Sequence, residues 1–235
     1  MIAALKKEVW KANLDLVRHG LVISTFGNVS GMDRKKGLVA IKPSGTSYES
    51  LKPADMVVVD LEGRTVEGAL NPSSDTPTHL EIYKAFPEVS AVAHTHSEFA
   101  AVFAQAGMEI PCLGTTHADH FAGRVPLTRR LSLAEAAKDY ESAVGRAIVE
   151  RFGRLEPLEM PGVLVSGHGP FTWGRSAGEA VLNSLLLETV ARMAWETLIL
   201  NPQAKPLAEH IRRRHFLRKH GPGAYYGQGK KGALK

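Results

Sequence analysis

The chain has 235 residues, of which 44% are hydrophobic and 23% are charged, as in an ordinary globular protein. The formal net charge of +5 suits a small anionic substrate, and without a nucleic-acid motif the basic residues favour a solvated surface over nucleic-acid binding. The single cysteine, Cys112, excludes an intrachain disulfide and fits a reducing cytoplasm. No apolar run approaches the roughly 20 residues of a membrane span.

Apolar spacing, capping residues and turn residues predict helices that alternate with clusters of short strands. In chain order we expect a helix at 2–20, strands at 21–24, 38–41 and 56–60, a helix at 75–86, a strand at 91–95, a helix at 132–152, a strand at 162–165, and helices at 176–200 and 207–219. This order predicts a layered α/β domain with a mixed or antiparallel sheet. No linker-like stretch divides the chain, so we expect one domain.

The strongest local signal is the pair His94 and His96 at the end of an apolar strand. Alternate residues of a strand point the same way, so the two imidazoles share a face. A third imidazole, His168, lies between two glycines after another apolar strand. Three nitrogen ligands with an open fourth position are typical of catalytic zinc, whereas the alternative is a set of solvent-facing polar residues.

Other polar residues have a structural and a functional interpretation. Asp75 is a candidate N-cap for the helix that follows it. The segments 27–28, 42–45 and 73–74 are either turns or phosphate-binding loops. The segment 115–120 is either a hydrogen-bonded loop or an acid–base set. Tyr226 lies in a glycine-rich tail that would need a docking partner to be ordered. We assign His19, His79 and His210 to helix surfaces.

Several long motifs occur in one order along nearly the whole chain. They include Gly27-Asn28-Val29-Ser30, Ile41-Lys42-Pro43-Ser44-Gly45, Pro72-Ser73-Ser74-Asp75, His94-Thr95-His96-Ser97, Gly114-Thr115-Thr116-His117-Ala118-Asp119, His168-Gly169-Pro170-Phe171 and Ala224-Tyr225-Tyr226-Gly227-Gln228. With these motifs the chain resembles the class II aldolase/epimerase superfamily. His120 departs from the pattern, since an aromatic residue usually follows the aspartate. The domain would span residues 1–228, and residues 229–235 would form a short basic tail.

The resemblance implies a three-layer α/β/α sandwich with a largely antiparallel central sheet, assembled as a ring-shaped homotetramer. It also implies roles for individual residues. The residues that would hold zinc are Asp75, His94, His96 and His168. The residues that would bind the substrate, chiefly its phosphate, are Gly27, Asn28, Ser44, Gly45, Ser73, Ser74 and His215. The acid–base pair would be Asp119 and Tyr226. We expect Asp119 to serve the metal of its own chain and Tyr226 to complete the site of a neighbouring chain.

The resemblance implies a reaction that inverts carbon 4 of a pentulose 5-phosphate and so interconverts L-ribulose 5-phosphate and D-xylulose 5-phosphate. Carbon 4 carries no acidic proton, so the carbon 3–carbon 4 bond must break and re-form by retro-aldol and aldol steps. One alternative is a phosphosugar aldolase of the same superfamily that releases the two fragments. Another is a protein that binds metal or sugar phosphate without turnover.

Overall fold

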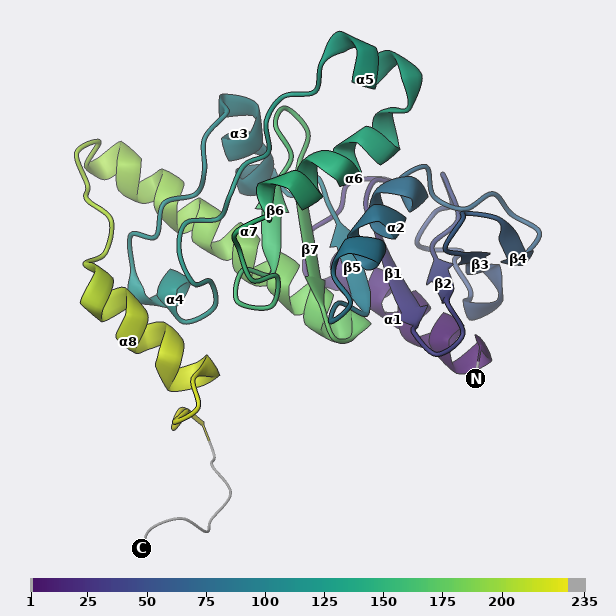
Figure 1. Cartoon of the computed structure of the whole chain (residues 1–235), viewed down its shortest axis with the longest axis horizontal. Coiled ribbons are helices and arrows are strands. Elements are labelled where there is room, and N and C mark those ends of the chain that lie inside the picture. The colour runs from purple at the N-terminus through teal and green to yellow at the C-terminus, as the bar shows by residue number, and fades with distance from the viewer. Residues whose placement is uncertain (1, 228–235) are drawn as a thin grey trace, which may run out of the picture.

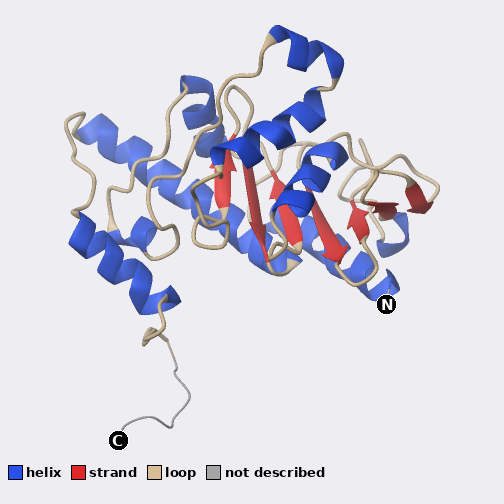
Figure 2. Ribbon diagram, viewed as in Figure 1, coloured by secondary structure: helices blue, strands red, loops and turns tan. Residues whose placement is uncertain are grey.

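One seven-stranded sheet organises the computed structural model, which describes residues 2–227 (Figures 1 and 2). The strand order is β4-β3-β2-β1-β5-β7-β6, and every neighbouring pair is antiparallel. The strands are β1 (Asn28–Asp33), β2 (Leu38–Ile41), β3 (Val57–Asp60), β4 (Thr65–Glu67), β5 (Ala91–His94), β6 (Gly162–Leu164) and β7 (Pro170–Gly174). The expected basic tail, residues 229–235, lies outside the described residues.

Helices lie on both faces of this sheet, which confirms the predicted three-layer arrangement (Figure 1). Helices α1 and α7 pack on one face, and α2 and α6 pack together on the other. The helices are α1 (Ile2–Arg18), the 3-10 turn η1 (Pro53–Asp55), α2 (Thr76–Ala85), α3 (Glu98–Ala106), α4 (Thr115–Ala118), α5 (Leu133–Lys138), α6 (Tyr140–Arg151), α7 (Ala177–Leu200) and α8 (Glu209–His220). None of these described helices is both long and apolar enough to cross a membrane.

Strand β5 shows how the two layers share the central sheet. Ala91 and Ala93 are fully buried in a cluster with Ala177 and Ala180 of α7, whereas Val92 is buried in a cluster with Tyr83 of α2. Side chains alternate between the two faces of a strand, so both faces of β5 are core. This double burial explains why the segment contains only small and apolar residues before it reaches His94.

Two of the predicted elements differ in the structure. Residues 21–24 do not form a strand, because Ser24 has a φ of 56° and Gly27 a φ of 87°, and the pairing strand begins only at Asn28. The single helix expected over 132–152 is two helices, because Asp139 between α5 and α6 has an extended φ of −164°. Strand β7 escaped prediction since it begins with proline and ends with glycine, which are weak strand formers.

The close contact between α2 and α6 depends on Gly145. A Cβ atom there would lie 2.6 Å from Cβ of Glu81 and 3.2 Å from Cα of Thr78. We therefore expect Gly145→Ala to lower the free energy of unfolding by about 1–3 kcal/mol, as overpacking usually does, measured by urea denaturation. Gly178→Ala in α7 is the matched control, because a Cβ there meets no atom within 4 Å. It should be neutral or stabilising by up to about 1 kcal/mol, and equal effects at both positions would contradict the packing argument.

Candidate functional site

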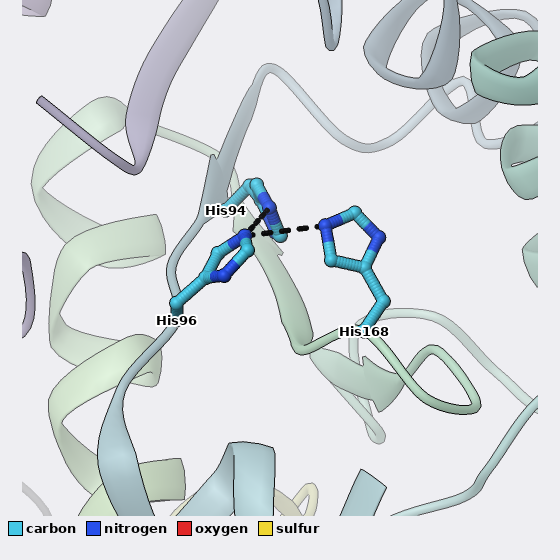
Figure 3. Close-up of side chains that lie close together, drawn as sticks. All are labelled: His94, His96 and His168. Atoms are coloured by element: carbon cyan, nitrogen blue, oxygen red, sulfur yellow. Dashed lines mark hydrogen bonds between the residues drawn. The ribbon is translucent and has the colours of Figure 1, made fainter. Parts of the chain in front are cut away.

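Three imidazoles converge at the end of the sheet where strand β5 finishes and strand β7 begins (Figure 3). His94 is the last residue of β5, His96 follows it, and His168 lies in the turn before β7. Nε2 of His96 is 3.1 Å from Nε2 of His94 and 3.2 Å from Nε2 of His168. One ring nitrogen from each histidine lies within 4.8 Å of the others, so the structure brings these three predicted ligands together.

The second ring nitrogens show which atoms are available to a metal. Nδ1 of His94 lies 2.9 Å from the carbonyl oxygen of Pro170, an acceptor that keeps the proton on Nδ1 and leaves the Nε2 lone pair free. Nδ1 of His168 lies 3.4 Å from the hydroxyl of Tyr140. Histidines that ligate metals are usually oriented by such a partner on the other nitrogen. The donor set therefore fits a divalent metal.

Burial keeps two of these rings in the neutral form that metals bind. Burial lowers the pKa of His168 to about 3, with His94 and His96 adding to the shift. Burial and His94 also lower the pKa of His96. Both rings are therefore uncharged at neutral pH, and no proton competes for their ring nitrogens there.

Asp75 occupies the N-cap position of α2, but its side chain makes no capping hydrogen bond. Its Oδ2 instead accepts a hydrogen bond of 2.7 Å from Nδ2 of Asn28. Burial favours the protonated form of Asp75, but His94, His79, the Asn28 hydrogen bond and His168 outweigh it and lower its pKa. Among the described residues, the group that meets within 4.8 Å comprises the histidines without Asp75. Its role as a fourth ligand stays a prediction.

Two of the segments predicted to bind phosphate lie side by side. The backbone of Ser73 donates to the carbonyl of Lys42, and the backbone of Ser44 donates to the carbonyl of Asn71. Asn28 joins this group because its Nδ2 also lies 3.1 Å from Oγ of Ser73. The structure thus places Ser73 beside Asp75, whose backbone N–H donates to Oγ of Ser73. Gly45 and Ser74 are exposed on the same two turns.

Gly27 lies where no other residue fits. Its φ is 87°, and a Cβ atom would lie 2.8 Å from Val22 and 3.0 Å from the carbonyl oxygen of His94. The hydroxyl of Tyr48 donates to the Gly27 carbonyl at 2.8 Å. The same tyrosine ring lies 4.6 Å from the ammonium of Lys42, which is 2% exposed and whose pKa burial lowers to about 8.

His79 was assigned to a helix surface from the sequence, and this was wrong, because its side chain is completely buried. Its Nδ1 lies 2.7 Å from Oγ of Ser30, which in turn lies 2.7 Å from the hydroxyl of Tyr83. Burial lowers the pKa of His79 to about 3, so the ring is neutral. Spacing along the helix did not reveal that this side faces β1.

The predicted acid–base residues lie in a different part of the chain. Asp119 follows α4, and its Oδ1 accepts hydrogen bonds from His215 at 3.0 Å and Arg218 at 2.9 Å, both on α8. Tyr226 lies against the same helix, with its ring 4.9 Å from the guanidinium carbon of Arg218. Figure 1 shows α4 and α8 at one end of the molecule, away from β5.

Within residues 2–227, no hydrogen bond joins Asp119, His215 or Tyr226 to the three histidines. Asp119 and Tyr226 both contact Arg218 of the same chain, and the chain whose metal each of them serves stays a prediction. In the sequence, Arg218 is one of several basic residues of α8, and no local pattern marks it as a partner of Asp119.

Comparison with known proteins agrees with this architecture and defines the class of the protein. The model of the Class II Aldolase and Adducin N-terminal domain matches residues 7–195, so the chain belongs to this family. Among its relatives is the L-ribulose-5-phosphate 4-epimerase UlaF of Salmonella paratyphi B (strain ATCC BAA-1250 / SPB7). It is 54% identical over 224 residues, which cover 95% of this chain and 98% of the relative. The protein of the same name from Salmonella typhi matches with the same identity and coverage.

Solved structures show the same fold at lower identity. A structure titled L-fuculose 1-phosphate aldolase superposes with a TM-score of 0.77 at 26% identity, over 90% of this chain and 94% of that chain. An aldolase II superfamily protein from Pseudomonas syringae superposes with a TM-score of 0.76 at 16% identity, over 94% of this chain and 88% of that chain. The second likeness bears on the fold alone.

Removing one of the converging imidazoles should release the metal. We expect His168→Asn to lower bound metal per chain by at least about tenfold at a fixed free metal concentration, because two nitrogen ligands hold a divalent ion less tightly than three. Bound metal is measured by atomic emission after equilibrium dialysis. His210→Asn is the control, since His210 lies exposed on α8. Full metal occupancy in the His168 variant would remove this residue from the site.

Proposed function

We propose that this chain is an L-ribulose-5-phosphate 4-epimerase, which interconverts L-ribulose 5-phosphate and D-xylulose 5-phosphate. The observation that carries the proposal is the 54% identity, over almost the full length of both proteins, to relatives that bear this name. The three converging imidazoles and the adjacent turns supply the metal and anion ligands that the reaction requires.

The substrate dictates what the site must provide. Carbon 3 lies beside the ketone and carbon 4 does not, so deprotonation cannot invert carbon 4. Breaking the carbon 3–carbon 4 bond gives the enediolate of dihydroxyacetone and the aldehyde glycolaldehyde phosphate. Rotation of the aldehyde and attack on its opposite face restore the bond with inverted configuration. The site must therefore stabilise negative charge, retain the phosphate and move a proton on each face.

His94, His96 and His168 would hold the metal, with Asp75 as a proposed fourth ligand. A divalent metal there would act as a Lewis acid that stabilises the negative charge developed on bond cleavage. We propose zinc, because it prefers imidazole and carboxylate ligands in a small coordination shell with one open position. These ligands also accommodate manganese or cobalt, so metal identity requires direct measurement.

The phosphate would be held by the two neighbouring turns beside the metal. Ser44, Gly45, Ser73 and Ser74 offer hydroxyl and backbone N–H donors, and Gly27-Asn28 lies between these turns and His94. Lys42 adds a buried cation whose ammonium lies 3.4 Å from one carbonyl oxygen and 3.5 Å from another. A dianionic phosphate near this group would favour its charged form, which burial alone disfavours. Retention of the phosphate keeps the aldehyde fragment in place while it rotates.

Asp119 and Tyr226 would move the protons, with Asp119 as the carboxylate base and Tyr226 as the phenolic acid on the opposite face. His215 would assist substrate or the proton relay through its contact with Asp119. Because α4 and α8 lie away from β5 within one chain, we propose that they serve the metal of a neighbouring chain in a homotetramer. Closed rings repeat such a contact at every interface.

The lone buried Cys112 is compatible with a cytoplasmic enzyme.

The nearest alternative function is a phosphosugar aldolase, and the superposition on a structure titled L-fuculose 1-phosphate aldolase is the observation that supports it. Analysis of the reaction products distinguishes this alternative from the proposed epimerase. We expect L-ribulose 5-phosphate to yield D-xylulose 5-phosphate, and L-fuculose 1-phosphate to remain uncleaved, as followed by ¹³C NMR of labelled substrates. Epimerisation is expected because the fragments are retained until the bond re-forms. Release of glycolaldehyde phosphate without the epimer would contradict the proposal. No conversion by the metal-loaded protein would favour a binding protein.

Mixed tetramers test which chain supplies each group. Asp119→Asn alone should lose about two to four orders of magnitude of activity, the usual scale for a positioned proton-transfer group. His96→Asn should be inactive for lack of metal. If Asp119 acts on a neighbouring chain's metal, reassembling these two variants together restores about a quarter of the wild-type sites by random mixing.

A second mixture, Asp119→Asn with Tyr226→Phe, gives the opposite pattern. It should stay inactive if both residues act from one chain, because every site then keeps one defect. Recovery in this mixture, with none in the first, would instead support a site in which Asp119 serves its own chain's metal and Tyr226 comes from the neighbour. Native mass spectrometry confirms that mixed tetramers have formed.

A further inference from the structure

Arg218 makes a two-pronged contact with the predicted base. Its Nε donates to Oδ1 of Asp119 at 2.9 Å, and its Nη2 donates to Oδ2 at 2.5 Å. The two residues are 99 positions apart, and both side chains are largely buried, with 24% of Arg218 and 11% of Asp119 exposed. A planar guanidinium that binds both oxygens fixes the orientation of the carboxylate as well as its position.

The same arginine also holds the segment that carries the predicted acid. The chain turns back after α8, and the carbonyl oxygen of Arg218 accepts from the backbone of Tyr225 at 3.0 Å and of Tyr226 at 3.1 Å. The Arg218 guanidinium carbon lies 4.9 Å from the centre of the Tyr226 ring, within the range of a cation–π contact. One side chain therefore touches both proposed proton-transfer residues.

We propose that Arg218 is a positioning residue that holds Asp119 and Tyr226 in one fixed arrangement. This inference rests on the proposed function, in which those two residues transfer protons. Arg218 itself exchanges no proton, because a guanidinium stays charged throughout the accessible pH range. It fixes the carboxylate through the edge of its guanidinium and the phenol ring through the face, so the two groups keep one relative position.

Lys219 is the obvious competitor for this role, and its geometry is weaker. Its ammonium lies 4.4 Å from the centre of the Tyr226 ring but 3.8 Å from Oδ2 of Asp119, too far for a hydrogen bond. Lys219 also contacts Nε2 of His120. It supplies charge near the pair, whereas Arg218 supplies the directional bonds.

The charges around Asp119 determine the sign of the expected pH effect. The titratable and charged groups that face it are Arg218, Lys219, His215 and His220 from α8, with His120 from its own segment. Burial acts to raise the pKa of Asp119, but hydrogen bonds from Arg218 and His215 and the charge of Lys219 outweigh it and lower the pKa. A carboxylate base loses activity as the pH falls through its pKa. Loss of Arg218 therefore moves the acid limb of the pH–rate profile to higher pH.

The test uses Arg218→Gln and Arg218→Lys in the metal-loaded protein. We expect Arg218→Gln to lower kcat by about 100-fold, the scale of a misplaced reacting group. Its acid limb should move up by about one to three pH units, the usual effect of an adjacent opposite charge on a carboxyl. Amide hydrogen exchange over residues 221–227 should accelerate. Arg218→Lys keeps the positive charge but cannot bind both carboxylate oxygens through one planar group. Its acid limb should therefore lie close to the wild-type pH, whereas its kcat should stay low.

Arg213→Gln is the matched control, because it removes the same charge from an exposed position of the same helix. It should leave kcat, the acid limb and hydrogen exchange at their wild-type values. Arg218→Gln with a wild-type acid limb and wild-type exchange over 221–227 would overturn the inference. Hydrogen exchange does not depend on turnover, so failure of the proposed function is seen separately. Faster exchange in a protein with no epimerase activity would leave Arg218 a structural anchor and overturn the catalytic role.

Discussion

The candidate metal centre depends on the pairing of β5 with β1 on one side and with β7 on the other. The register aligns Asn28, His94 and Phe171 in a row across the three strands. The His94 ring stacks on Phe171 with its centre 4.1 Å away, and its Nδ1 reaches the carbonyl of Pro170. A slip of one residue would turn His94 to the opposite face of the sheet. The side-chain packing and the backbone pairing thus fix the same ring in one orientation.

Sequence patterns were sufficient to predict the layers and the three imidazoles. The His-x-His spacing on an apolar strand and the glycines around His168 each have a direct geometric meaning, and the structure brings these residues together. Strands without a strong sequence pattern, such as β7, were not predictable in the same way. Pairing with neighbouring strands, rather than the propensity of their residues, makes them strands. The predicted helices match the observed ones to within a few residues except at the extended residue Asp139, whereas the short helices α3 and α4 were not predicted.

Residues that act through a distant partner were the ones that sequence analysis missed. His79 belongs to a helix whose neighbours along the chain do not reveal Ser30, which lies 49 positions earlier and meets its Nδ1. Arg218 lies among other basic residues of α8, and nothing local distinguishes it from an exposed arginine such as Arg213. Its partner is 99 positions away. Such contacts require the fold, since a side chain's chemistry is ambiguous until its neighbours are known.

The strand order also has a consequence for how the chain folds. β1 pairs with β5, and β5 pairs with β7, so the three imidazoles meet only after segments separated by about a third of the chain have paired. Such non-local pairing makes folding slow, because the entropy of closing long loops is lost before the contacts that compensate for it have formed. A partly folded chain offers at most the local His94–His96 pair. We therefore expect tight capture of a divalent ion only after β5 and β7 have paired, so that excess metal leaves the rate of the preceding steps unchanged.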